Sequence, residues 1–219
     1  LSPGLQLLPE RSATQDLNIL AAGLTEARQG FPALPGVQQE VGTIAAEVKA
    51  KVLLDGQFTQ AGFQEQLDAT SFPVGHIATH GQFSSNPDET FLLTWNDRIG
   101  VKDFDRILQN PERGTPSSID LLVMSACQTA AGDRRATLGL AGLALRSGAR
   151  STLASLWAVN DNSTAQLMSE FYHQLAQQRV QPDITKAQAL RQAQLSLLKN
   201  PQYNHPYYWA AFVLIGNWL

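Results

Sequence analysis

The chain has 219 residues, of which 43% are hydrophobic and 16% charged, and its net charge is −3. This composition excludes a largely disordered chain, and the length fits one large domain or two small ones. The weakly acidic balance argues against a nucleic-acid-binding surface over the whole domain. The apolar runs are shorter than the roughly 20 residues that cross a membrane, so no membrane partner is expected.

The single cysteine, Cys127, limits both the chemistry and the compartment of the protein. One cysteine forms neither an internal disulfide nor a cysteine-rich zinc site, which indicates a reducing compartment. The first residues lack the charged start and long apolar core of a secretory signal, so we expect a cytoplasmic protein. Residues 1–15 have few periodic features and are interpreted as a lead-in from a missing N-terminal part. Residues 16–219 are interpreted as one domain.

The hydrophobic pattern predicts strands that alternate with helices. In chain order we expect a strand at 16–23, a helix at 37–50, a strand at 51–54, a helix at 58–69, a strand at 74–81, a strand at 90–95 that pairs antiparallel with a neighbour, a helix at 101–108, a strand at 118–126, a helix at 137–147 with Gly148 at its C-cap, a strand at 150–157, helices at 162–177 and 184–198, and a strand at 207–215 in the packed interior. Asp161 or Asn162 is expected to cap the helix at 162–177.

This alternation predicts an α/β fold with a mostly parallel sheet and helices on both faces. In such sheets the functional residues gather at the carboxyl ends of the central strands. Two candidate segments lie at the carboxyl ends of predicted strands, namely His80-Gly81 and Ser125-Ala126-Cys127.

Several familiar site motifs are absent from the sequence. It has no phosphate loop, no G-x-S-x-G elbow, no H-E-x-x-H pair and no Cys-x5-Arg, because position 133 is Asp. His76 and His80 are four residues apart, but no cysteine or acidic cluster nearby completes a metal site. We therefore expect neither a metal nor a cofactor.

The two remaining candidates suit nucleophilic catalysis. A cysteine thiol is mostly protonated at neutral pH and needs a nearby imidazole, which then acts as the acid for a leaving amine. His80 and Cys127 fit these roles, and the backbone N–H groups of Gly81 and Cys127 could form an oxyanion hole. The alternative is that Cys127 is a small core residue and His80 a hydrogen-bonded packing residue.

Several motifs together resemble one family of peptidases. His80 precedes Cys127 by 47 residues, and Ala126-Cys127-Gln128 matches part of the caspase signature. The motifs FPALPG (31–36), IATHG (77–81), MSACQT (124–129), LASLWAVND (153–161), LMSEFY (167–172) and HPYYWAAFVLIGNW (205–218) resemble the CHAT domain, a caspase-like cysteine peptidase family of clan CD. The resemblance implies a caspase-like three-layer sandwich and peptide-bond hydrolysis through a thioester, with His80 as the base and Cys127 as the nucleophile.

The resemblance also implies a substrate pocket and partners. Related peptidases often place an acidic residue in the pocket for the side chain before the cut, and Asp161 is the candidate, with Asp133 as a second. The alternative for Asp161 is a helix cap. The substrate would be a protein or peptide, and a tetratricopeptide-repeat or other regulatory domain would lie on the same chain or on a partner. Two other functions stay open: a catalytically silent interaction module, and an acyl transferase or amidase.

Overall fold

Six strands form the central sheet, in the order β2-β1-β3-β7-β8-β9. The structure is a computed structural model that describes residues 17–82, 86–108, 119–125, 142, 144–181 and 183–219. The strands are β1 (Asn18–Gly23), β2 (Lys49–Leu54), β3 (Val74–Ala78), β7 (Leu121–Met124), β8 (Ser151–Ser155) and β9 (Phe212–Gly216). The first five run parallel, and β9 runs antiparallel to β8. The predicted mostly parallel sheet is confirmed.

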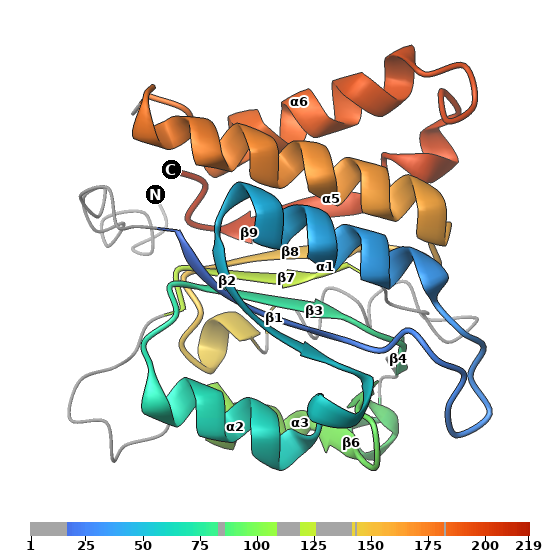
Figure 1. The fold of residues 1–219 in the computed structure, drawn as a ribbon, viewed down its shortest axis with the longest axis vertical. Coiled ribbons are helices and arrows are strands. Elements are labelled where there is room, and N and C mark those ends of the chain that lie inside the picture. Colours follow the sequence, from blue (N-terminus) through green and yellow to red (C-terminus); the bar gives the residue numbers. More distant parts are fainter. Residues whose placement is uncertain (1–16, 83–85, 109–118, 126–141, 143, 182) are drawn as a thin grey trace.

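Helices cover both faces of this sheet, which gives the three predicted layers (Figure 1). The upper layer holds α1 (Pro35–Glu47), α5 (Asp161–Ala176) and α6 (Lys186–Lys199), and the lower layer holds α2 (Gln60–Ala69) and α3 (Val101–Leu108). Short 3-10 turns lie at Asp55–Gln57, Pro87–Glu89, Gln177–Arg179 and Pro206–Tyr208. Most of the helix expected at 137–147 lies outside the described residues, and Gly148 beyond it has a positive φ of 116°.

The central strands are buried because each face of the sheet packs against helices, and β1 shows how apolar residues fill both faces. In β1, Ile19 and Ala21 pack in the upper hydrophobic cluster with the residues of α1 and α5, whereas Leu20 and Ala22 pack in the lower cluster. Successive side chains of a strand point to opposite faces, so a continuous apolar run is buried on both. The short apolar runs therefore predicted buried strands correctly.

A second, smaller sheet follows β3. It contains β4 (Gly81–Gln82), β5 (Phe91–Leu93) and β6 (Arg98–Gly100), all paired antiparallel. The antiparallel pairing expected for 90–95 is confirmed in β5. The sequence analysis missed β6, since a three-residue strand between turns carries no periodic signal. It also ran β3 into β4, because the apolar pattern does not show the break at Thr79 and His80.

Two details of the upper layer and one of the sheet differ from expectation. α1 ends at Glu47 rather than at residue 50, because β2 already begins at Lys49. Asn160 caps α5 by accepting a hydrogen bond from the Ser163 N–H, so the caps predicted at Asp161 or Asn162 were wrong. In the part of the chain that the structure describes, β9 pairs with β8 alone and forms an edge of the sheet, so the packed interior strand expected at the C-terminal end was also wrong.

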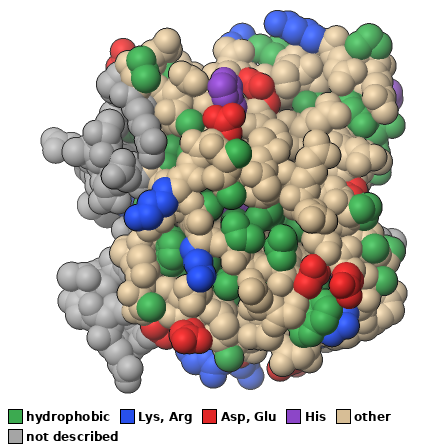
Figure 2. Space-filling model, in the orientation of Figure 1, with side chains coloured by type: hydrophobic (Ala, Val, Ile, Leu, Met, Phe, Trp, Pro, Cys, Tyr) green, Lys and Arg blue, Asp and Glu red, His purple; other side chains and the backbone are tan. Residues whose placement is uncertain are grey.

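The surface mixes polar, charged and hydrophobic groups. On the face in Figure 2, lysine and arginine side chains are scattered, and hydrophobic ones lie between the two helical layers. β2 forms the other edge of the sheet and exposes Lys49 and Lys51. Charged side chains at an edge strand discourage pairing with another sheet. Among the described helices, none is both long and apolar enough to span a bilayer.

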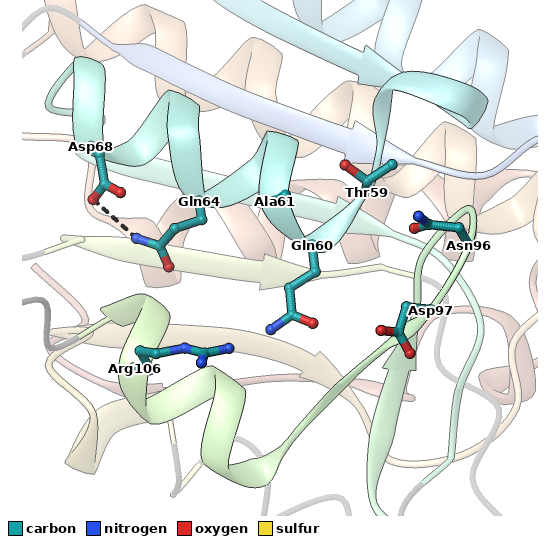
Figure 3. A pocket seen from close by; sticks show the side chains of 8 residues that line it. All are labelled: Thr59, Gln60, Ala61, Gln64, Asp68, Asn96, Asp97 and Arg106. Carbon is teal, nitrogen blue, oxygen red and sulfur yellow. Dashed lines mark hydrogen bonds between the residues drawn. The ribbon is translucent and has the colours of Figure 1, made fainter.

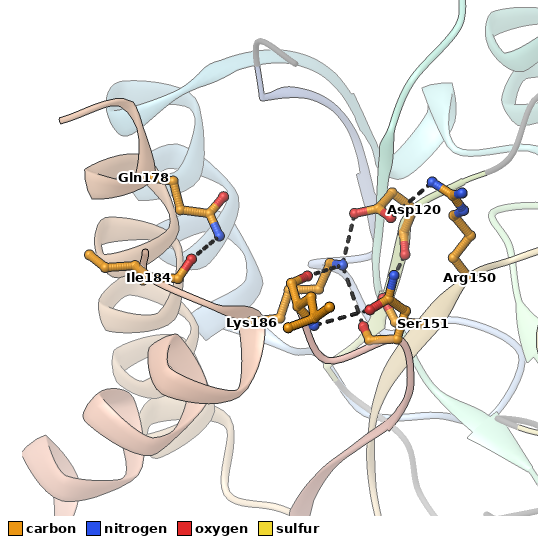
Figure 4. A network of polar contacts seen from close by, with 8 residues as sticks. Asp120, Arg150, Ser151, Gln178, Ile184 and Lys186 are labelled. Atoms are coloured by element: carbon orange, nitrogen blue, oxygen red, sulfur yellow. Dashed lines mark hydrogen bonds and ion pairs between the residues drawn. The ribbon is translucent and has the colours of Figure 1, made fainter. Parts of the chain in front are cut away.

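Lys186 on α6 links the last residues of the chain to Asp120, which precedes β7 (Figure 4). Its ammonium lies 3.0 Å from Asp120 Oδ2 and donates to the carbonyls of Leu219 at 2.7 Å and Asn217 at 3.4 Å, while the side chain is buried. Hydrogen bonds to a buried charge contribute more to stability than neutral ones.

We expect Lys186→Met to lower the free energy of unfolding by about 2 kcal/mol, because the two carbonyls and Asp120 lose their donor. Urea unfolding followed by circular dichroism measures this change. Lys199→Met, at the exposed end of the same helix, is the control and should stay near the wild type. Equal stability of the two variants would contradict a structural role for the Lys186 contacts.

Candidate active site

His80 lies at the carboxyl edge of the sheet, where a tight connection leads from β3 into the small sheet. Thr79 Oγ1 donates to the Leu93 carbonyl at 2.8 Å, and the Leu93 N–H donates to the His80 carbonyl at 2.8 Å. Gly81 then opens β4 opposite Leu92. These bonds fix the backbone of His80 between the two sheets, as expected for a functional residue at the end of a central strand.

The His80 imidazole is held by the loop that precedes α1. Nε2 lies 2.8 Å from the Pro32 carbonyl oxygen, and the ring stacks on Phe31 with centroids 5.0 Å apart. A carbonyl oxygen only accepts hydrogen bonds, so Nε2 carries the proton when the ring is neutral. Nδ1 is then the basic nitrogen. This arrangement leaves one defined nitrogen of a fixed ring for proton transfer.

Burial lowers the pKa of His80 below its ordinary value of 6.5, because a charged imidazolium loses hydration in this position. The side chain is only 6% exposed. The Pro32 carbonyl and the negative charge of Asp161 oppose this effect in part. The imidazole therefore stays neutral, and able to accept a proton, at pH 7.

The loop between β1 and α1 carries Phe31 and Pro32, which contact the His80 ring, and several contacts hold this loop in place. Its turn closes with mutual backbone hydrogen bonds between Arg28 and Phe31, and Gln29 and Gly30 adopt positive φ of 48° and 86°. The Arg28 guanidinium stacks 3.1 Å above the Trp95 ring and donates from Nε to the Trp95 carbonyl. The sequence analysis quoted FPALPG only as a family motif and missed the roles of Phe31 and Pro32.

Asp161 lies at the first position of α5, and its carboxylate contacts the start of α1. Oδ2 accepts a hydrogen bond from the Gly36 N–H at 2.6 Å. Asp161 thus supports α1 rather than capping its own helix, and a negative charge at a helix N-terminus is favourable. Burial raises the pKa of Asp161, as does the charge of Glu40, while the Gly36 N–H and His80 act in the opposite direction.

Gly81 has a backbone geometry that suits an oxyanion donor. Because the Leu93 N–H donates to the His80 carbonyl, Gly81 and Leu92 form a non-hydrogen-bonded pair of the antiparallel ladder. The N–H groups of such a pair do not bond across to each other's strand. The Gly81 N–H is therefore not used for pairing with β5.

The proposed nucleophile Cys127 lies outside the described residues, as does Asp133. The described part of that segment ends at Ser125, whose N–H donates to the Ile77 carbonyl at 3.1 Å and continues the pairing of β7 with β3. Trp157 follows β8, packs beside the upper cluster and donates a hydrogen bond from its indole N–H to the Tyr207 carbonyl.

Two cavities of about 590 Å³ lie away from His80. Figure 3 shows the first, which opens between α2, α3 and the turn before β6 and is lined by polar side chains, among them Gln60, Gln64 and Arg106. The second lies over α1, α5 and α6. Neither includes His80, Gly81 or Asp161 in its lining. Within the described residues, no three His, Cys, Asp or Glu side chains are grouped to hold a metal.

Comparison with known proteins identifies both family and fold. The family model of the CHAT domain matches residues 4–217. Gingipain R (RgpB), whose crystal structure is described as that of an Arg-specific cysteine proteinase, superimposes with a TM-score of 0.55 at 10% identity, over 92% of this chain and 46% of that one. The complex of the Porphyromonas gingivalis RgpB pro- and mature domains gives 0.54 at 10% identity, over 91% and 46%. The chain therefore spans about half the length of these structures. None of the curated proteins matches it.

Proposed function

The chain belongs to the CHAT-domain family, and from this premise we propose that it is a cysteine endopeptidase with His80 as the base and Cys127 as the nucleophile. Its fold is that of the caspase-like clan CD peptidases, to which the gingipain structures belong. The observation that carries the proposal is the fixed imidazole of His80. Pro32 binds its Nε2, so Nδ1 is the nitrogen that we assign to proton transfer at the carboxyl edge of the sheet.

The pairing register of the two central strands supports the dyad. The residues of β3 from Val74 to Ile77 pair with the residues 47 positions later in β7, as Ile77 does with Met124. Cys127 likewise follows His80 by 47 positions. His80 and Cys127 each follow closely on the carboxyl end of one of these neighbouring strands, which are about 4.8 Å apart, so we infer that the two residues approach each other at this edge of the sheet. That spacing suits proton transfer between a thiol and an imidazole.

The proposed reaction uses these groups in order. Nδ1 of His80 takes the proton of the Cys127 thiol, and the thiolate attacks the carbonyl carbon of the scissile peptide bond. The N–H groups of Gly81 and Cys127 bind the oxyanion of the tetrahedral intermediate. The imidazolium then protonates the leaving amine and leaves a thioester. Water, deprotonated by Nδ1, hydrolyses the thioester and releases the acid and the free thiol.

Asp161 is the proposed substrate residue for a basic side chain before the cut. It has a carboxylate near the proposed base, close enough for its charge to act on His80. Its Oδ2 is bound by the Gly36 N–H, so Oδ1 is the oxygen that we assign to an arginine or lysine side chain. An ion pair with hydrogen bonds to a partly buried carboxylate selects a cation over a neutral residue of similar size.

The test is hydrolysis of a peptide library in which the residue before the cut varies. We expect cleavage after arginine and lysine, measured by mass spectrometry of the products. Because the chain has one cysteine, alkylation by iodoacetamide blocks Cys127 selectively and serves as the control. An unmodified chain that cleaves no peptide, or an alkylated chain that still does, would refute the peptidase. Turnover of small acyl esters without peptide cleavage would indicate an acyl transferase or amidase.

A further inference from the structure

We propose that Asp161 is a positioning residue for His80, because it anchors the loop whose Phe31 and Pro32 hold the imidazole. This role is separate from binding a basic side chain, and it rests on the proposed function only in taking His80 as the base. The contact behind this proposal joins two helices that are far apart in the sequence. A carboxylate at the start of α5 fixes the start of α1, and α1 follows directly after the loop that reaches His80 (Figure 1).

The contact between Asp161 and Gly36 is short and leaves no space for a side chain at position 36. The Gly36 N–H donates to Asp161 Oδ2 at 2.6 Å. A Cβ added at Gly36 would meet the three carboxyl atoms of Asp161 at 2.7–2.8 Å, which is closer than real Cβ contacts. The carboxyl group is therefore packed directly against the backbone of Gly36, and this close approach explains a glycine here.

Only three residues lie between Pro32 and Gly36, so the anchor acts near the imidazole. Within this span the Leu34 N–H donates to the Thr25 carbonyl at 3.0 Å, which ties the two limbs of the loop together. A backbone this short and cross-linked transmits the loss of an end contact to the Pro32 carbonyl. A shift of that carbonyl would leave Nε2 of His80 without its acceptor.

The other anchors of the loop belong to a different part of the molecule. Asp55 accepts hydrogen bonds from the Thr25 N–H and hydroxyl at 2.7 Å each, and Arg28 stacks on Trp95. These contacts join the first half of the loop to the end of β2 and to the small sheet. Asp161 holds the opposite end, next to the upper helices. Loss of Asp161 should therefore free the half of the loop that carries Pro32.

The same carboxylate serves both roles through different oxygens. Oδ2 holds Gly36, whereas Oδ1 is the oxygen assigned to the substrate. Asparagine keeps an oxygen that accepts from the Gly36 N–H but has no charge, whereas alanine keeps neither. The pair of variants Asp161→Asn and Asp161→Ala therefore separates positioning from the recognition of a cation.

The experiment follows the ring nitrogens of His80 by NMR in protein labelled with ¹⁵N-histidine, with His80→Gln used to assign the signal. In the wild type and in Asp161→Asn we expect the neutral ring to carry its proton on Nε2. In Asp161→Ala we expect a mixture of both tautomers. Gly36→Ala should reproduce the mixture, because its methyl group pushes the carboxylate away. Asn160→Ala, which removes the cap of the same helix but not the Gly36 contact, should keep the wild-type tautomer.

Kinetics on peptides with a neutral residue before the cut give a second readout. Asp161→Ala and Gly36→Ala should lower kcat by about 10-fold through a displaced base, whereas Asn160→Ala, which keeps the Gly36 contact, should have the kcat of the wild type. The NMR readout needs no activity, so an inactive peptidase does not affect it. An unchanged tautomer in Asp161→Ala, or the same mixture in Asp161→Asn, would overturn the positioning role.

Discussion

Replacing His80 with alanine is expected to lower kcat/KM for a peptide substrate by about 10³-fold, within the range for loss of a general acid–base group. The same variant should lose the reactivity of Cys127 towards iodoacetamide below pH 8. An isolated thiol has a pKa of about 8.5, and a neighbouring imidazole extends its reactivity to lower pH. Whole-protein mass reports the alkylation of a single site, because the chain has one cysteine.

The pH dependence of this effect follows from the environment of His80. Burial lowers the pKa of the imidazole below 6.5, and a base works only in its neutral form, which exists above that pKa. As the pH decreases, kcat/KM should therefore fall to half of its maximum only at a pH below 6.5. A solvent-exposed histidine would already be half protonated at pH 6.5. His173→Ala, at an exposed histidine of α5, is the control and should leave both profiles unchanged. Slow alkylation that is identical in wild type and His80→Ala would mean that the two residues do not form a dyad.

The sequence predicted the parts of the fold that depend on burial. A strand covered on both faces needs consecutive apolar residues, and LLVM at β7 is such a run. Helices with one buried face repeat their apolar residues at helical spacing, as Leu167, Phe171 and Leu175 do in α5. The position of His80 after β3 followed from the same pattern. A sheet must also have edges, and the apolar sequence of β9 could not show that it forms one.

Contacts made by the backbone could not be predicted in this way. The acceptor for His80 is the carbonyl of Pro32, and every residue has a carbonyl, so no residue type marks the position. The donor to Asp161 is likewise the backbone N–H of Gly36, 125 residues away in the chain. Asp161 was recognised as a helix-start residue, but the sequence did not show that it supports a different helix. The glycines at 30 and 36 were the available signals, since each marks a turn or a close approach.

Removing the carboxylate of Glu40 is expected to lower the free energy of unfolding by about 3 kcal/mol. Glu40 on α1 is 1% exposed and lies 3.0 Å through Oε1 from Nε2 of His76, which is fully buried on β3. His76 Nδ1 lies 3.0 Å from the hydroxyl of Tyr172, and apolar residues of the upper cluster surround the group. Each of these polar atoms depends on its neighbour, because no water reaches them to replace a lost partner.

Three variants distinguish the interaction between Glu40 and His76 from the packing of their side chains. The free energy of unfolding of each is measured with urea. Glu40→Leu leaves the buried His76 without its carboxylate, and His76→Phe leaves Glu40 and the Tyr172 hydroxyl without their imidazole partner, so each variant should be strongly destabilised without creating a large cavity. The double variant carries neither group and should be less destabilised than the sum of the two singles. Strictly additive losses would show that the two side chains are not coupled.

The pair also connects the core to the candidate site, which gives it a role besides stability. The negative charge of Glu40 helps to raise the pKa of Asp161, so Glu40→Leu should shift the titration of Asp161 to lower pH. His76 lies 3.5 Å from the hydroxyl of Ser125, two residues before Cys127. Replacing a buried ion pair by well-packed apolar residues is often neutral or stabilising, and in some proteins the pair serves to fix the arrangement of its neighbours. We therefore expect the double variant to fold but to alkylate at Cys127 with an altered pH profile, and an unchanged profile would limit the pair to a structural role.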